Sequence, residues 1–155
     1  MFALKEAKST AEFETGAQLF KEYALEIAID LSFQDFEQEL RTIEHQYSRP
    51  EGALILAFNR EQSPVGCAGI RRLETKICEL KRMYIRQRAR GLGLGKQLMQ
   101  QSIQFAKELG YERMRLDTLP RMKAAVHLYE SMGFYEIEPY RYNPIEGVTY
   151  MEAQL

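Results

Sequence analysis

A basic, glycine-rich turn between an apolar segment and a helix is the part of the sequence with the clearest chemical meaning. The apolar segment ends at Ile85, arginines follow up to Arg90, and glycines alternate with other residues from Gly91 to Gly95. Glycines let backbone N–H groups approach a ligand, and the first turn of a helix has N–H groups without intrahelical acceptors at the positive end of its dipole. The segment therefore predicts a diphosphate site.

Two common phosphate motifs do not fit this turn. A P-loop needs four residues between its glycines and a hydroxyl residue after its lysine, but Lys96 is followed by Gln97. A dinucleotide-binding fold has its glycine turn after the first strand, whereas this turn lies in mid-chain after what we expect to be antiparallel strands. A glycine turn that only brings a strand close to a helix stays open as the alternative.

Length and composition indicate one soluble domain over residues 1–155 that folds without disulfides or metal. No apolar run approaches the roughly 20 residues that cross a bilayer, and the N-terminus lacks the features of a signal peptide, so we expect a cytoplasmic protein with no membrane partner. Cys67 and Cys78 are expected to be reduced core residues, and His45 and His127 to be structural, so no metal site is predicted.

Charge is unevenly distributed along the chain, although the net charge is only −1. Residues 1–45 are rich in Glu and Asp, which suits a cation, and residues 71–96 are basic, which suits a polyanion. The basic stretch is short and lacks the alternating aromatic residues of a base-stacking surface, so nucleic acid is not an expected partner.

The pattern of apolar residues predicts alternating strands and helices. Ser9 or Thr10 caps a first helix that runs to about Ile29, and Ser32 with Asp35 begins a second whose apolar face includes Phe36. The expected strands are 2–4, 53–58 (apolar on both sides, hence central), 65–73, 76–85, 114–117, 134–138 and 148–153, and two later helices cover 94–109 and 123–132.

Two motifs in this order resemble a known family. Arg90-x-x-Gly93-x-Gly95 follows residues 79–85, and Leu128-Tyr129-Glu130-Ser131-Met132-Gly133-Phe134 comes later. The pair, over nearly the whole chain, resembles the GNAT family of acyl-CoA-dependent N-acetyltransferases. The resemblance implies an α/β (α+β) fold: a mixed, strongly twisted central sheet of about seven strands, with helices on both faces and a splayed middle that holds acetyl-CoA.

The resemblance also assigns the cofactor-binding residues. The backbone of the strand end would pair with the pantetheine arm as an added strand, and the glycine turn would hold the pyrophosphate, with extra charge from its basic residues. These residues are Met83, Tyr84, Ile85, Arg88, Arg90, Gly91, Leu92, Gly93, Leu94, Gly95 and Lys96. Each basic side chain among them could equally be a solvated surface residue.

Acyl transfer to an amine needs a base for the ammonium, a donor for the carbonyl oxygen and a proton for the thiolate. The resemblance indicates Tyr129 as the acid, and a core aromatic residue is the alternative. Glu79, which period-two alternation places on the face of Met83, is favoured as the base over Asp117. Water or another group is also left open as the base, and each of the two carboxylates could instead be paired with Arg82 or Arg115.

The sequence departs from the family at the start of the helix that carries Tyr129. Many relatives have an asparagine there, whereas this chain reads Leu119-Pro120-Arg121-Met122-Lys123. A contact to CoA that depends on that asparagine is therefore absent or replaced.

The expected acceptor is the primary amine of a small or amino-acid-like molecule. In the family, the first helices and the link before the last strand wall the acceptor pocket, and here they offer aromatic and acidic side chains that suit an amine. These are Phe33, Phe36, Tyr47, Tyr140, Tyr142, Asp30, Asp35, Glu37 and Glu39. A protein or peptide N-acetyltransferase, a non-catalytic acyl-CoA-binding regulatory domain, and assembly into a homodimer are left open.

Overall fold

One seven-stranded sheet organises the molecule, with the strand order β1-β2-β3-β4-β5-β7-β6. The computed structural model describes residues 1–155, except for the side chains at positions 33 and 34. The β4–β5 pair is parallel and the other neighbours are antiparallel, so the expected mixed sheet is confirmed. The strands are β1 (Ala3–Glu6), β2 (Ala53–Phe58), β3 (Pro64–Glu74), β4 (Ile77–Ile85), β5 (Arg113–Thr118), β6 (Tyr135–Ile137) and β7 (Thr149–Gln154).

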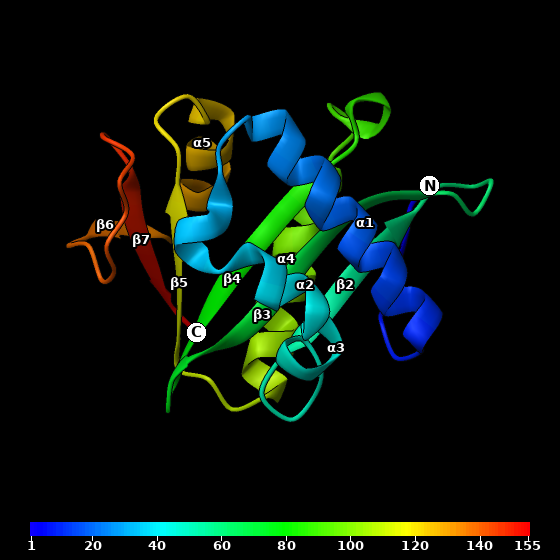
Figure 1. The fold of residues 1–155 in the computed structure, drawn as a ribbon, viewed down its shortest axis with the longest axis horizontal. Helices are drawn as coiled ribbons and strands as arrows, with labels where there is room; N and C mark the ends of the chain where they lie inside the picture. Colours follow the sequence, from blue (N-terminus) through cyan, green and yellow to red (C-terminus); the bar gives the residue numbers. More distant parts are fainter.

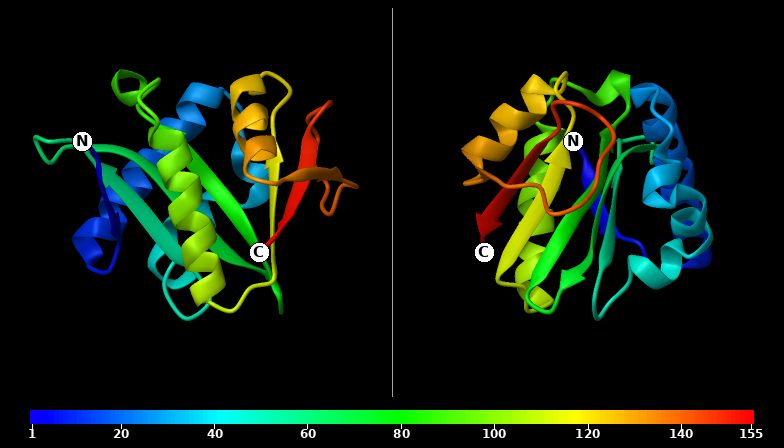
Figure 2. Two further views of the ribbon diagram at one scale, coloured as in Figure 1. Left: turned by 180° about the vertical axis from the view of Figure 1, so that it is seen from behind. Right: turned by 60° about the vertical axis from the view of Figure 1, so that its left-hand side comes forward.

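Helices cover both faces of this sheet, as expected (Figures 1 and 2). The helices between β1 and β2 lie on one face of the sheet. Helices α4 and α5 lie on the other face, and the left view of Figure 2, taken from behind, shows them in front of the strands. The helices are α1 (Thr10–Ile27), the short 3₁₀ helix η1 (Leu31–Gln34), α2 (Phe36–Arg41), α3 (Ile43–Gln46), the 3₁₀ turn η2 (Gln87–Ala89), α4 (Leu94–Glu108) and α5 (Lys123–Ser131).

Each face of the sheet has its own hydrophobic core. Ile55 and Leu98 belong to the core under α4 and α5, and Leu54 and Phe20 to the core under α1 and α3. Strand β2 supplies both cores, which explains why its sequence is apolar on both sides. Gly16 brings α1 close to the sheet, because a Cβ there would lie 2.3 Å from a methyl carbon of Leu54.

Local signals set the first helix as predicted. Ser9 is the N-cap of α1, and a capping box joins it to Glu12, whose N–H donates to the Ser9 hydroxyl over 3.2 Å. The Glu12 carboxylate in turn accepts from the Ser9 N–H over 3.0 Å. These bonds satisfy donors that the helix itself leaves unpaired.

The single second helix expected from Ser32 onward is wrong, because the segment forms the separate helices η1, α2 and α3. Asp30, not Ser32, caps η1 by accepting from the Ser32 N–H, and Asp35 then takes a left-handed conformation with a φ of 57° that ends the first turn. The Thr42 hydroxyl donates to the Gln38 carbonyl between α2 and α3. Such side-chain bonds compete with a continuous helical ladder.

Candidate active site

Strand β4 contains an extra residue that bends it. Cys67 of β3 pairs with Tyr84, but Gly69 pairs with Lys81, so the register slips by one residue between these pairs. Arg82 lies inside the slip with a φ of 58°, in the left-handed region that residues other than glycine rarely adopt. A bulge of this kind bends a strand and redirects its side chains.

The sheet opens directly beside this bulge. Strands β4 and β5 pair only through Ile77–Arg113, Cys78–Met114 and Glu79–Arg115, and Figure 1 shows them diverging beyond that point. The splayed middle that the family resemblance implied is therefore present. Because β4 runs on to Ile85, its backbone groups that face β5 have no strand partner there.

The bulge also corrects one expectation about side-chain direction. We expected Glu79 and Met83 to share a face at period two, which is wrong. Glu79 and Lys81 pair with Arg71 and Gly69 on the face of α1 to α3, whereas Met83 packs against the core under α4. The inserted Arg82 reverses the alternation between the two positions.

The glycine turn forms an open cradle at the start of α4. Gly91 and Gly93 have φ values of 78° and 84°, and no atom lies within 4 Å of where their Cβ atoms would be. Gly93 is the N-cap, so the next three residues present N–H groups without intrahelical acceptors. Gly95 has a second task, since a Cβ there would lie 3.2 Å from Leu128 of α5. This arrangement fits a diphosphate.

Basic side chains of the turn differ in their surroundings. Arg88 and Lys96 are exposed. Arg90 is tied to the protein, because its Nη2 lies 2.5 Å from the Glu26 carboxylate of α1 and its Nε donates to the Ile85 carbonyl over 2.8 Å. Arg88 and Lys96 are thus the basic side chains of the turn that stand open to an anion.

Two cavities meet at the opening of the sheet and share Tyr23, Arg82, Asp117 and Thr118. We call the one between β4, β5 and α5 the splay cavity and the one under the β6–β7 link the link cavity. The splay cavity is also lined by Leu80, Lys81, Met83, Leu116, Met122, Ala125 and Tyr129. The link cavity is also lined by Ile27, Ile29, Leu31, Leu119, Asn143, Ile145 and Val148.

Predicted catalytic residues Tyr129 and Asp117 both line the splay cavity, together with Met83. Burial raises the pKa of Tyr129, with smaller effects of Tyr23 and Asp117 in the same direction. The phenol therefore stays protonated at neutral pH and can donate a hydrogen bond into the cavity. Its ring also packs against Phe134, with 5.9 Å between centroids, so the core role left open for Tyr129 holds as well.

Asp117 and Thr118 carry the unsatisfied polar atoms of this region. Among the described side chains, Asp117 Oδ2 and Thr118 Oγ1 are buried without a hydrogen-bond partner. Buried polar atoms are seldom left unpaired, so their position in both cavities points to a ligand that supplies donors. The expected alternative pairing of Asp117 with Arg115 is wrong, because Arg115 Nε donates to Glu152 over 2.8 Å.

Glu79 is fully buried and surrounded by donors, and it lines neither cavity. Its carboxylate accepts from Arg141, from the Tyr140 hydroxyl over 2.8 Å and from Arg71 over 3.4 Å. Burial alone would raise the pKa of Glu79, but Lys81, Arg141 and Arg71 hold it below its ordinary value. Glu79 thus belongs to an ion-pair cluster and not to the lining of the cavities that Asp117 shares.

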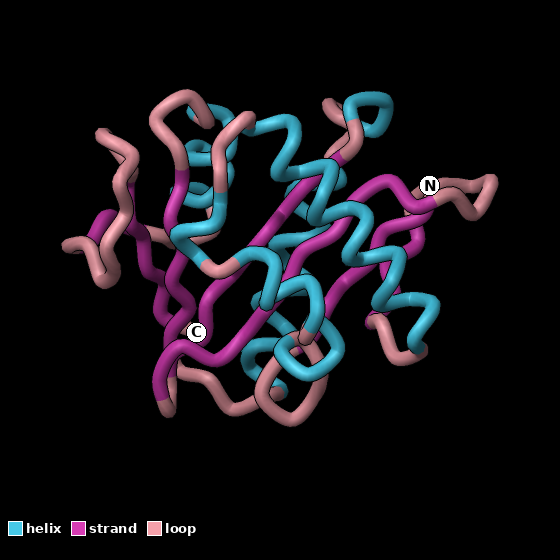
Figure 3. Tube along the Cα trace, in the orientation of Figure 1, coloured by secondary structure: helices cyan, strands magenta, loops and turns pink.

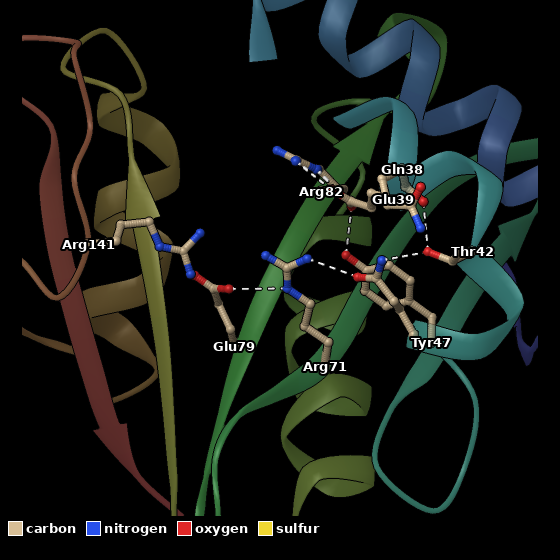
Figure 4. Close-up of polar contacts among 9 residues, drawn as sticks. Gln38, Glu39, Thr42, Tyr47, Arg71, Glu79, Arg82 and Arg141 are labelled. Atoms are coloured by element: carbon tan, nitrogen blue, oxygen red, sulfur yellow. Dashed lines mark hydrogen bonds and ion pairs between the residues drawn. The ribbon is translucent and has the colours of Figure 1, made fainter. Parts of the chain in front are cut away.

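Arg82 pairs with Glu39 rather than with Glu79, which corrects the other expected pairing (Figure 4). Its Nη2 and Nε donate to the two Glu39 oxygens over 2.7 and 3.1 Å. The Tyr47 hydroxyl donates to Glu39 over 2.7 Å from below. The ring of Phe36 lies against the guanidinium, 5.1 Å from its carbon.

Lys81 is a second buried cation in the splay cavity, with 3% of its surface exposed. Burial lowers its pKa to about 7, against the opposing effects of Glu79 and Asp117. Tyr23, Lys81, Arg82, Thr118 and Asn143 were all missed as site residues. A Lys-Arg pair in the middle of a mostly apolar strand is the signal that could have identified two of them.

Acidic residues expected around the acceptor do not line the two cavities. Asp30 caps η1, Asp35 and Glu37 are exposed, and Glu39 is occupied by Arg82. Of the expected aromatic residues with described side chains, Phe36, Tyr47 and Tyr140 belong to the ion-pair clusters and Tyr142 is 79% exposed. The side chain of Phe33 lies outside the described part.

Arginine side chains tie the two sides of the opened sheet together. Arg121, after β5, donates to the Ile27 carbonyl at the end of α1. Arg141, in the β6–β7 link, donates to Glu79 of β4. Residues 138–148 have no regular secondary structure and appear as the loop beside β5 and β7 in Figure 3. The first of these bonds ends on Ile27, which also lines the link cavity.

The remaining expectations concern cysteines, histidines, metal and membrane. Cys67 and Cys78 are buried free thiols, and burial raises the pKa of Cys78 to about 12. His45 and His127 are exposed. In the described part of the chain, no group of three or more His, Cys, Asp or Glu could hold a metal ion, and no helix is both long and apolar enough to span a bilayer.

Comparison with known proteins agrees with this geometry. The model of the Acetyltransferase (GNAT) family matches residues 17–134. A Schizosaccharomyces pombe protein named as an uncharacterised N-acetyltransferase is 36% identical over 99% of this chain and 94% of its own length. The human N-acetylaspartate synthetase is 30% identical over 75% of this chain and 39% of its own length. A GNAT-family acetyltransferase structure from Staphylococcus aureus superposes with a TM-score of 0.79 over 99% of both chains, at 25% identity.

Fold, site and relatives together define an acyltransferase. The chain belongs to the GNAT family of N-acetyltransferases.

Proposed function

We propose that the protein transfers the acetyl group of acetyl-CoA to the primary amine of a small, amino-acid-like molecule by direct attack on the thioester. The observation that carries this proposal is the convergence of three features at one opening of the sheet. The glycine cradle starts α4 at the end of β4, the unpaired edge of β4 leads from it, and Tyr129 and Asp117 line the cavity beside that edge.

The residues present fit acetyl-CoA. Amides of residues 91–96 would hold the diphosphate, with Arg88 and Lys96 adding charge, and the β4 edge from Met83 to Ile85 would pair with the amides of the pantetheine arm. The bound co-substrate supplies an activated acyl group. Its thioester would then lie in the splay cavity.

Residues of the chain would handle the protons. Asp117 takes a proton from the acceptor ammonium, and the freed amine nitrogen then bonds to the acetyl carbon as the carbon–sulfur bond breaks. A backbone N–H near Met83 can donate to the carbonyl oxygen as it gains charge. Tyr129 donates its hydroxyl proton, or a hydrogen bond, to the leaving thiolate. The amine nitrogen loses its second proton as the amide forms, and this proton restores the Tyr129 phenol, or passes to water where Tyr129 gave only a hydrogen bond.

We assign the base to Asp117 rather than to Glu79, which was favoured from the sequence. Asp117 lines both cavities and has a buried oxygen without a partner, whereas three donors already surround Glu79. A base needs an oxygen that no other donor occupies, within hydrogen-bond reach of the proton that it removes. Glu79 instead positions the β6–β7 link through Tyr140 and Arg141.

Small acceptors are favoured over proteins because Arg121 and Arg141 both form bonds that bridge the opening of the sheet. The name of the human relative also supports an amino acid as acceptor, since it describes synthesis of an N-acetylated amino acid.

A screen of amines with acetyl-CoA, followed by release of free thiol, tests the proposal. Several small amines with a carboxylate or other polar group should release thiol well above the acetyl-CoA hydrolysis control, and mass spectrometry should find the N-acetylated product. Binding of CoA with no thiol release from any small amine, but release with peptides, would support a peptide acetyltransferase instead. Binding without turnover of either class would support a regulatory domain.

A further inference from the structure

The two cavities are lined by basic as well as acidic side chains, although an amine acceptor is itself a cation. Arg82 lines both cavities and Lys81 lines the splay cavity, whereas Asp117 is the acid that lines them. The nearby acids Glu39 and Glu79 already face arginines. An acceptor with only an ammonium group would offer no acceptor atoms to the N–H donors of Arg82 that Glu39 does not use.

Arg82 is held as a rigid donor at the junction of the cavities. Its left-handed backbone conformation turns it out of the strand, and the bidentate pair with Glu39 fixes one edge of the guanidinium. Figure 4 shows the side chain extending from β4 toward the gap beside β5. Among the described residues, Glu39 accepts two hydrogen bonds from Arg82. These bonds use two of the five N–H donors of the guanidinium.

We infer that the acceptor carries a carboxylate as well as its amine, and that Arg82 binds this carboxylate while Asp117 receives the ammonium. This inference rests on the proposed function and names the substrate class of the same site. Arg82 and Asp117 both line the link cavity and the splay cavity, so a small amino acid bound where the two cavities meet would lie next to both side chains. Arginine suits the task because its planar donors match the two oxygens of a carboxylate.

Discrimination should be strong, because a site built around buried charged donors rejects an analogue that leaves them unpaired. A wild-type enzyme should therefore use an α-amino acid with a kcat/KM at least about 100-fold above that of the matching primary amide or of the decarboxylated amine. The comparison with the amide is conservative. The carboxamide group lowers the pKa of the neighbouring amine, so more of the amide is in the reactive neutral form. Without recognition of the carboxylate, the amide would therefore be the better acceptor.

The variant that tests the role of Arg82 is the double change Glu39→Gln with Arg82→Gln. Removing both charges avoids leaving either partner buried and unpaired. The ratio of kcat/KM between amino acid and amide should fall to within about 3-fold of unity, because the neutral glutamine cannot supply a charged fork. The matched control is Glu51→Gln with Arg72→Gln, an exposed pair 3.2 Å apart outside the cavities, which should keep the full ratio.

Three outcomes would overturn the inference in distinguishable ways. Equal use of amino acids and their amides by the wild-type enzyme removes the carboxylate requirement while the proposed function stands. A double variant that folds, as checked by thermal denaturation, yet keeps the ratio excludes Arg82 as the partner. Absence of both CoA binding and thiol release with every acceptor defeats the proposed function itself. If the double variant does not fold, the wild-type panel alone still decides the acceptor class.

Discussion

Single side chains around the opening show how burial alone does not define a catalytic group. Glu79 and Asp117 both lie at the opened pair of strands, but donors surround the first and the second has an oxygen without a partner. The Tyr129 side chain belongs to the core under α4 and α5 and also lines the splay cavity. The difference lies in which buried oxygens lack a hydrogen-bond partner, and the sequence does not encode that locally.

Replacing Tyr129 by phenylalanine should slow thiol release by about 10- to 100-fold and leave CoA affinity unchanged, because only the donor to the thiolate is lost. Steady-state kinetics and calorimetric titration with CoA would measure the two effects. Tyr135→Phe is the control, since that hydroxyl donates to Glu152 outside the cavities. Unchanged turnover in Tyr129→Phe with a good acceptor would remove the assignment.

Lys81 predicts a pH-dependent stability difference. Its folded pKa is lowered to about 7 from an ordinary 10.5, so between these values the unfolded chain binds more protons and stability rises with pH. Lys81→Met should therefore increase the free energy of unfolding most at or below about pH 7, and this gain should shrink toward pH 10. Urea unfolding across this range would measure it.

Lys76→Met provides the reference for that experiment, because Lys76 is exposed and precedes the same strand. Its effect should be small at every pH. A gain from Lys81→Met that grows with rising pH would contradict the lowered pKa.

Residues that depend only on motif spacing could be predicted, and those that depend on strand geometry could not. Tyr129, Asp117 and the glycine turn were found from the sequence and lie at the opening. The shared face of Glu79 and Met83 was wrong because Arg82 takes a left-handed conformation without a glycine to announce it. A prediction from the period-two alternation of side chains assumes that the strand contains no extra residue.

At the scale of elements, the uneven charge along the chain is largely explained by ion pairs between distant segments. Arg86 of the basic region lies 2.5 Å from Glu22 of α1, and Arg82 and Arg90 likewise pair with acids of the first helices. The asymmetry that suggested external partners of opposite sign therefore serves partly to dock the first helices onto β4 and the turn.

The glycine cradle allows a matched pair of substitutions. Gly93 and Gly110 both have positive φ values, 84° and 90°, with no atom within 4 Å of a built Cβ. Valine at either position should cost about 1–3 kcal/mol of unfolding free energy through backbone strain. Gly93→Val alone should weaken CoA binding, by about 100-fold or more, because amide contacts to a charged diphosphate are worth roughly 1.5–3 kcal/mol each.

Calorimetry with CoA and chemical unfolding of both variants would separate the effects. Similar loss of CoA affinity in Gly93→Val and Gly110→Val would show that the cradle has no specific part in binding.

Helices whose ends are marked by a capping residue or a glycine were predicted well. Ser9 starts α1 and Gly110 follows α4, as their types and positions indicated. The second helix failed as a single element because its course is set by tertiary contacts, with Tyr47 and Glu39 anchored beneath Arg82. Such contacts override local helix signals.

The whole molecule consists of a four-stranded and a three-stranded half, joined by the short β4–β5 pairing and by the ties from Arg121 and Arg141. A ligand that fills the opening adds contacts to both halves. The co-substrate should therefore stabilise the entire fold rather than one edge of it.

Saturating CoA should raise the thermal midpoint. At about 100 times its dissociation constant, a ligand that binds only the folded state adds about 2.7 kcal/mol. For a chain of this size that corresponds to roughly 5–10 °C. Differential scanning fluorimetry would measure the shift, with adenosine as a control that lacks the diphosphate and the pantetheine arm. No shift at any CoA concentration would remove the basis of the proposed function.

The residue inserted at Arg82 has a practical consequence for sequence alignment and for protein engineering. A relative whose equivalent strand lacks the bulge would align without a gap, yet its side chains after that point would face the opposite way. Substrate-determining residues copied across such an alignment would end up in the wrong layer of the protein. Transfers of specificity into this scaffold should therefore be made with the bulge and its Glu39 partner as one unit.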